Sequence, residues 1–185
     1  MKLEKRLTYG LYIFLVLNII YNFIFNNGDK LYRILLVFLS VIILQLAFKF
    51  TLLRTYRKLY IPILVFIFFA TYLARVLNFY RFDSYDKFLH FSSGILIGYI
   101  GLVIYDSFFY EKENIKGRII FAIIFGIALA GVWEIWEFTC DSLFNMNLQK
   151  SVEDTMLDII CGAVGGILAS LIGSKLMKID QKIWT

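Results

Sequence analysis

The sequence predicts an all-α protein, a polytopic transmembrane helical bundle of six spans that forms a single integral membrane domain over residues 1–185. Hydrophobic residues make up 60% of the chain, and there is only one proline. The mean hydropathy is +0.74. This composition excludes a soluble domain and a disordered chain. A spanning helix needs about 20 mostly apolar residues. The segments that meet this need are 8–26, 31–48, 59–80, 87–109, 119–141 and 155–177.

The basic residues predict the orientation of the spans. Most of the 19 Lys and Arg residues lie near the two termini and in the second and fourth connections. The positive-inside rule then places both termini in the cytoplasm. The net charge of +5 is thus a topological signal. We expect no nucleic-acid partner, because nucleic-acid binding would need a solvated basic face.

Acidic residues gather at the opposite, outer ends of the last three spans. An ionised carboxylate near the bilayer centre costs at least about 2.5 kcal/mol, so such residues usually face a partner or a cavity. With a helical rise of about 1.5 Å per residue, the three groups reach similar depths. We therefore expect them to converge in one polar chamber. The three groups are Asp83, Asp86 and His90; Glu134, Glu137 and Asp141; and Asp154 and Asp158.

Small residues continue the same helix faces towards the inner side. Small faces let membrane helices approach closely. We expect the last three spans to pack tightly there and to separate at the chamber. The small residues are Ser93, Gly94, Gly98 and Gly101; Ala130 and Gly131; and Gly162, Ala163, Gly165, Gly166 and Ala169.

The acids and the single histidine predict a divalent metal site. Sites rich in carboxylates favour Mg²⁺, Mn²⁺ or Ca²⁺, and a Zn²⁺ site with one histidine is also allowed. One carboxylate outside the ligand set, Glu137 or Asp141, would serve as general base. The candidate metal ligands are Asp86, His90, Glu134, Glu137, Asp154 and Asp158.

Two further residues are candidates for substrate binding. Arg75, near the outer end of the third span, would bind an anionic headgroup, because a guanidinium suits phosphate and carboxylate groups. Its alternative role is snorkelling to the lipid surface. Gln149 lies in the 142–153 connection, which we expect to fold over the chamber as a lid. Asp106, at the other end of the fourth span, is expected to reach solvent.

Three functions remain open at this point. The leading one is a metal-dependent hydrolase or transferase that acts on a membrane lipid or a lipid-linked phosphate. The second is a cation or proton-coupled transporter that uses the same acids. The third is an accessory membrane protein with a structural metal. A network of neutral, hydrogen-bonded acids is the alternative to a metal, because a low dielectric favours the protonated form. The oligomeric state is left open.

Several motifs resemble a known family. They are Asp86-Lys-Phe-Leu-His90-Phe, Trp133-Glu134-Ile-Trp-Glu137-Phe with Asp141, and Asn147-Leu-Gln149 followed by Asp154-Thr-Met-Leu-Asp158. In these motifs the chain resembles the YjdF-like family of uncharacterised bacterial inner-membrane proteins. More distantly it resembles VanZ-like proteins, linked to glycopeptide tolerance, which share an Asp-Lys-x-x-His start to a helix. The resemblance implies a multi-pass protein of the bacterial inner membrane in which these positions form one site, and it implies no particular activity.

Overall fold

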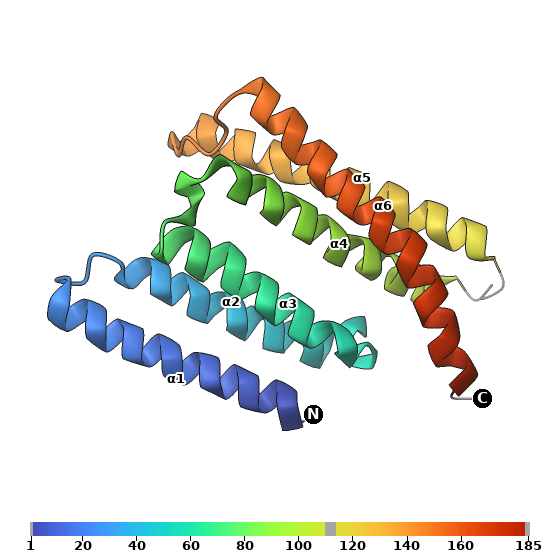
Figure 1. The fold of residues 1–185 in the computed structure, drawn as a ribbon, viewed down its shortest axis with the longest axis horizontal. Helices are drawn as coiled ribbons and strands as arrows, with labels where there is room; N and C mark the ends of the chain where they lie inside the picture. The colour runs from blue at the N-terminus through green and yellow to red at the C-terminus, as the bar shows by residue number, and fades with distance from the viewer. Residues whose placement is uncertain (1, 110–113, 184–185) are drawn as a thin grey trace. The chain divides into compact units, whose positions relative to one another are not determined.

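The computed structural model describes residues 2–109 and 114–183, with side chains for 3–109 and 114–174. Its described residues form helices and connections, without strands (Figure 1). The all-α fold is confirmed, and six helices are long and apolar enough to cross a membrane. The elements are α1 (Lys2–Phe25), α2 (Leu31–Phe50), η1 (Leu52–Thr55), η2 (Arg57–Leu59), α3 (Tyr60–Ile67), η3 (Phe68–Val76), η4 (Phe79–Arg81), α4 (Asp83–Phe108), α5 (Ile115–Phe144) and α6 (Val152–Ile183).

The third span differs from its predicted limits. Its apolar helix covers Arg57–Val76, whereas the sequence pattern indicated 59–80. Its second half, η3, is a π-helix, and the Leu77 amide donates to the Tyr72 carbonyl at 3.1 Å as the helix ends. Asn78 then adopts a left-handed conformation with φ 59°. Asn tolerates the left-handed region better than most residues. The chain therefore turns at Asn78, although the residues that follow are still mostly apolar.

The chain divides into two compact units, Met1–Tyr85 and Asp86–Thr185, here called the N-terminal and C-terminal units. The division falls inside the first turn of α4. The cytoplasmic location of both termini stays a prediction. The side chains of Lys2, Lys112, Lys175, Lys178 and Lys182, which contribute to that prediction, lie outside the described residues.

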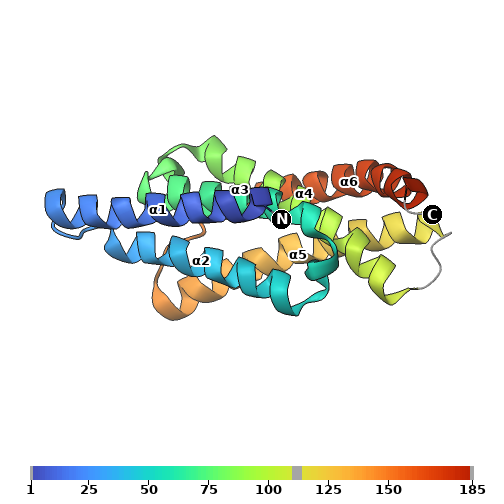
Figure 2. The ribbon, with the colours of Figure 1, turned by 90° about the horizontal axis from the view of Figure 1, so that it is seen from below.

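In the N-terminal unit, α1, α2 and α3 lie side by side and pack through large side chains (Figure 1, Figure 2). One buried cluster joins α1, α2 and η3, and a second joins α2 and α3. Tyr72 in η3 also donates a hydrogen bond to Asn18 Oδ1 at 2.6 Å. The clusters comprise Leu15, Ile34, Val37, Tyr72 and Val76, and Val41, Leu44, Phe48, Tyr60 and Leu64.

In the C-terminal unit, α4, α5 and α6 approach one another through glycine and alanine. A Cβ atom at Gly94 of α4 would overlap the carbonyl oxygen of Gly162, and one at Gly98 would lie 2.7 Å from that of Gly166. A Cβ atom at Gly101 would lie 2.9 Å from Cα of Ala122 in α5. The predicted close packing of these spans is therefore confirmed. Gly131 is different, because nothing lies within 4 Å of its Cβ position among the described residues.

The expectation that Asp106 reaches solvent is wrong. Its carboxylate lies 2.6 Å from the Arg118 guanidinium, and the two side chains are 9% and 6% exposed. Arg118 belongs to the first turn of α5, which runs beside the end of α4. Arg118, whose charge served only to predict the orientation of the spans, is thus part of a buried ion pair.

Candidate functional site

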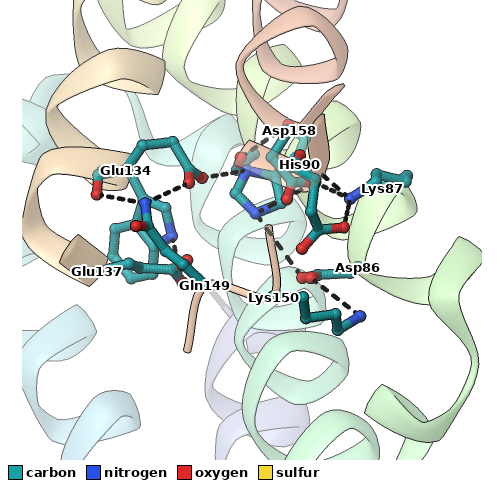
Figure 3. Close-up of polar contacts among 11 residues, drawn as sticks. Asp86, Lys87, His90, Glu134, Glu137, Gln149, Lys150 and Asp158 are labelled. Carbon is teal, nitrogen blue, oxygen red and sulfur yellow. Dashed lines mark hydrogen bonds and ion pairs between the residues drawn. The ribbon is translucent and has the colours of Figure 1, made fainter. Parts of the chain in front are cut away.

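His90 stands at the centre of a polar cluster in the C-terminal unit (Figure 3). It lies one helical turn after Asp86 on α4, so both side chains share a face. His90 Nε2 is 3.7 Å from Asp86 Oδ1 and 3.8 Å from Asp158 Oδ1 of α6. His90 Nδ1 is 3.8 Å from Glu134 Oε1 of α5. Each of the three helices therefore supplies at least one carboxylate next to a single imidazole.

One buried carboxylate oxygen in this cluster, Glu134 Oε1, accepts no hydrogen bond from any described residue, and Glu134 is only 3% exposed. Asp158 is equally buried, and its Oδ1 atom forms an ion pair with Lys87 Nζ at 2.9 Å. Buried polar atoms almost always have a hydrogen-bond partner, so each exception needs an explanation. Both oxygens face the ring nitrogens of His90, at distances longer than a hydrogen bond. The cluster thus has unused acceptor capacity around the histidine.

Lys87 is a site residue whose charge the sequence pattern used only to predict the orientation of the spans. Its Nζ atom lies 2.5 Å from Asp154 Oδ1 and 2.9 Å from Asp158 Oδ1 (Figure 3). It therefore ties the start of α4 to the start of α6. The signal in the sequence was its position beside Asp86 in the Asp-Lys-x-x-His motif. A second lysine, Lys150, has its Nζ atom 4.0 Å from Asp86 Oδ2.

The connection between α5 and α6 folds back over the cluster. Asp141 Oδ1 accepts a hydrogen bond from the Leu148 amide at 2.6 Å, and Asp141 Oδ2 accepts one from the Gln149 amide at 2.8 Å. Asn145 and Asn147 turn the chain with φ of 53° and 57°. Gln149 Nε2 then donates to the carbonyl oxygen of Glu134 at 3.1 Å and to its Oε2 at 3.3 Å.

The predicted candidates thus occupy different places in the structure. Asp86, His90, Glu134 and Asp158 lie together, with Gln149 against Glu134. The carboxylate of Asp154 contacts Lys87, and that of Glu137 accepts a hydrogen bond from Trp133 Nε1 at 3.1 Å. Asp141 has a structural partner on each of its oxygens. The roles of these residues as metal ligand, general base or substrate contact stay predictions.

Arg75 lies in the N-terminal unit. Its carbonyl oxygen accepts a hydrogen bond from Arg33 Nη1 at 2.8 Å, and its guanidinium lies over the Tyr80 ring at 5.8 Å from the centroid. Its assignment to substrate binding therefore stays a prediction.

Asp86, His90 and Asp158 have the geometry of a candidate metal centre. Each offers one ligand atom, and the three atoms lie within 4.8 Å of one another. Two donors that share an ion at about 2.1 Å each are separated by at most about 4.2 Å. The His90–Asp86 and His90–Asp158 separations fall within this limit. The donors combine one imidazole nitrogen with carboxylate oxygens, a set suited to Mn²⁺ or Zn²⁺ and, through the oxygens, to Mg²⁺ or Ca²⁺.

The fold and the cluster define a multi-pass helical membrane protein with an enclosed carboxylate–histidine site. The family described as "Predicted membrane protein (DUF2238)" matches residues 6–179, and the chain belongs to this family. An uncharacterised protein of Thermotoga maritima is 33% identical over 101 residues, which cover 54% of this chain and 53% of that protein. The match therefore spans about half the length of the relative. No solved structure matches the chain.

Proposed function

We propose that Asp86, His90 and Asp158 bind one divalent cation, with Glu134 beside the other ring nitrogen of His90, and that the protein uses the cation to hydrolyse or transfer the phosphoryl group of a lipid or lipid-linked substrate. The observation that carries the proposal is that Asp86, His90 and Asp158 each offer one ligand atom and that these three atoms lie within 4.8 Å of one another. A divalent cation between them would offset the two carboxylate charges that face His90 Nε2. Magnesium, manganese, calcium and zinc are the candidates.

A network of neutral acids explains the same atoms less well. In such a network the protonated carboxyl groups and the imidazole would lie within hydrogen-bond reach, about 2.6–3.2 Å. The ring nitrogens of His90 lie 3.7 Å from the Asp86 carboxylate and 3.8 Å from each of the Asp158 and Glu134 carboxylates. All three distances are longer than a hydrogen bond. Lys87 also supplies one positive charge to Asp154 and Asp158. One cation in addition would balance much of the remaining negative charge.

The proposed chemistry assigns different tasks to the acids. A bound cation polarises a phosphoryl oxygen and lowers the pKa of a coordinated water. Glu137 is the better candidate for general base, because it is half-buried and lies one turn from Glu134. Asp141 already accepts two backbone N–H groups, so we assign it to holding the connection in place. Gln149 positions Glu134 through its side-chain amide.

A cation or proton-coupled transporter is the second candidate. The buried Asp106–Arg118 pair favours it, because it places a second enclosed polar group towards the opposite end of α4. A carrier needs polar groups along its path on both sides of the membrane. The third possibility is an accessory envelope protein with a structural metal, as the resemblance to VanZ-like proteins suggests. We further propose the bacterial inner membrane as the location.

Metal analysis of the purified protein tests the site. We expect one Mg²⁺, Mn²⁺, Ca²⁺ or Zn²⁺ ion per chain by elemental analysis and calorimetric titration, and loss of this binding in His90→Ala. Glu137→Gln is the matched control, since it removes a nearby acid outside the three-residue centre and should retain the ion. Phosphate release from a lipid-linked diphosphate should need both the ion and Glu137. Stoichiometric binding without turnover, combined with ion flux in proteoliposomes, would favour the transporter; absence of binding by all four ions would exclude the proposed site.

A further inference from the structure

A second polar region, separate from the His90 cluster, lies in the N-terminal unit. It is a cavity of about 600 Å³ where the start of α1 meets the end of α2 and the short helices that follow. Its lining includes four basic side chains and one acidic side chain, Glu4. The basic residues are Lys5, Lys49, Arg54 and Arg57.

The positive charge of this cavity is only partly compensated. Arg57 lies 2.5 Å from the Glu4 carboxylate and neutralises it. The side chains of Lys5 and Arg54 make no ion pair or hydrogen bond with any residue whose side chain the structure describes. The Lys49 ammonium lies over the face of the Phe50 ring, 4.9 Å from its centroid. Within the described part of the chain, Lys5, Lys49 and Arg54 thus line one concave surface without a paired anion.

Neutral hydrogen-bonding groups complete the wall. The Thr8 hydroxyl donates to the Glu4 carbonyl oxygen at 2.9 Å, so the Tyr60 hydroxyl, 2.8 Å away, donates to Thr8, and both residues are buried. The Gln45 side chain also lines the cavity, where its Oε1 accepts a hydrogen bond from Tyr12. The cationic side chains, rather than these hydroxyl groups, would hold the oxygens of a phosphate group.

The surroundings indicate a lipid as the source of that phosphate. The cavity lies at the ends of helices that are long and apolar enough to span a membrane. Beside it, Tyr9 and Phe50 are 61% and 71% exposed. Basic side chains at the ends of spans attract anionic headgroups, and exposed apolar surface next to them suits acyl chains. We propose that this cavity binds the phosphate of an anionic phospholipid headgroup.

Native mass spectrometry in detergent, with defined lipids added, tests the proposal. We expect the wild-type protein to retain phosphatidylglycerol in preference to phosphatidylcholine. The double variant Lys5→Gln/Arg54→Gln should weaken phosphatidylglycerol retention roughly tenfold, because it removes two unpaired charges and leaves the Glu4–Arg57 pair intact. The matched control, Arg6→Gln/Lys58→Gln, removes the same charge from nearby positions in α1 and in the short helices after α2, at residues that do not line the cavity. It should retain the lipid.

The wild-type preference needs no variant, so the proposal can be tested even if a variant is unstable. Equal retention of the two lipids by the wild-type protein would overturn it. An equal loss in the two double variants would also overturn it, because the attraction would then come from general surface charge. Titration with inorganic phosphate separates the sources. Tight binding of free phosphate that depends on Lys5 and Arg54, without any lipid preference, would assign the cavity to a soluble anion and refute the lipid.

Discussion

The two units of this protein fill the space between helices in different ways. In the N-terminal unit, large side chains such as Leu15, Ile34 and Tyr72 form the contacts. In the C-terminal unit, glycine brings the backbones of α4 and α6 together, as at Gly94 and Gly98. Contacts made by side chains tolerate adjustment, because side chains can change rotamer. Backbone contacts leave no such freedom. They fix the spacing of the three helices that carry the His90 cluster.

Ion pairs show the same contrast. Asp106 and Arg118 in the C-terminal unit are both less than a tenth exposed. In the N-terminal unit, Glu4 is similarly enclosed, but the Arg57 side chain is 43% exposed. Water can therefore replace one partner in the N-terminal pair and neither in the C-terminal pair. The two units should therefore respond differently to substitution of a paired side chain or of a glycine.

Removal of the buried cation should have the largest effect. Arg118→Met leaves the Asp106 carboxylate enclosed without a counter-charge, and loss of one partner of a buried pair costs about 4 kcal/mol. Arg57→Met should cost about 1 kcal/mol, as expected for a partly solvated pair. Denaturant unfolding in detergent micelles measures both. The double variant Asp106→Leu/Arg118→Met should recover most of the loss, and equal costs for Arg118→Met and Arg57→Met would contradict the contrast.

Enlarging a glycine at the backbone contact should come next. Gly94→Val places side-chain atoms against the Gly162 carbonyl, and overpacking of this kind costs about 3 kcal/mol. Gly10 of α1 is the matched control, because nothing lies within 4 Å of its Cβ position among the described residues. Gly10→Ala should stabilise the helix slightly, by up to about 1 kcal/mol. Melting temperatures of the two variants measure the difference; a tolerated Gly94→Val would show that the helices can separate.

Removal of the proposed cation should be the third largest effect. A ligand present at a hundredfold excess over its Kd stabilises the native state by about 2.7 kcal/mol. A chelator at neutral pH should therefore lower the melting temperature, and Asp86→Asn should reduce this response by removing a charged ligand. Glu137→Gln should leave the response intact. A melting temperature unchanged by chelator and by added Mg²⁺, Mn²⁺, Ca²⁺ or Zn²⁺, in folded protein, would exclude an exchangeable ion.

The smallest effect should come from a single hydrogen bond in the N-terminal unit. Tyr72→Phe removes the bond to Asn18 Oδ1 and keeps the ring in its apolar cluster. The expected cost is about 1 kcal/mol. Denaturant unfolding measures it, and the double variant Tyr72→Phe/Asn18→Leu should cost little more, since both polar groups are then absent. A cost above that of Gly94→Val would contradict the contrast between the units.

The sequence predicted the six spans and the convergence of His90 with Asp86, Glu134 and Asp158. Both follow from simple geometry, since apolar length sets the spans and helical rise sets the depth of the acids. It did not predict the directions of long charged side chains. Lys87 and Arg118 counted as topological charges, yet the structure directs Lys87 to Asp154 and Arg118 to Asp106. Their flexible stems let the charge reach an enclosed partner from a residue near the helix end.

Other misses arose from backbone conformation. Nothing in the apolar pattern of residues 59–80 distinguished the α-helical first half of the third span from its π-helical second half. The left-handed turn at Asn78 also cannot be read from hydropathy. The role of Asp141 depended on how the connection after α5 folds back, and that path is set by two further left-handed residues, Asn145 and Asn147.

The folding back of this connection makes its backbone a reporter of the His90 cluster. The amides of Leu148 and Gln149 are bonded to Asp141, and the side chain of Gln149 is bonded to Glu134. Opening of the connection therefore also releases Glu134. A ligand that stabilises Glu134 must make this opening less favourable, because coupling between two equilibria is reciprocal. Deuterium uptake at these two amides thus follows occupancy of the cluster by any ligand that contacts Glu134, without knowledge of the reaction.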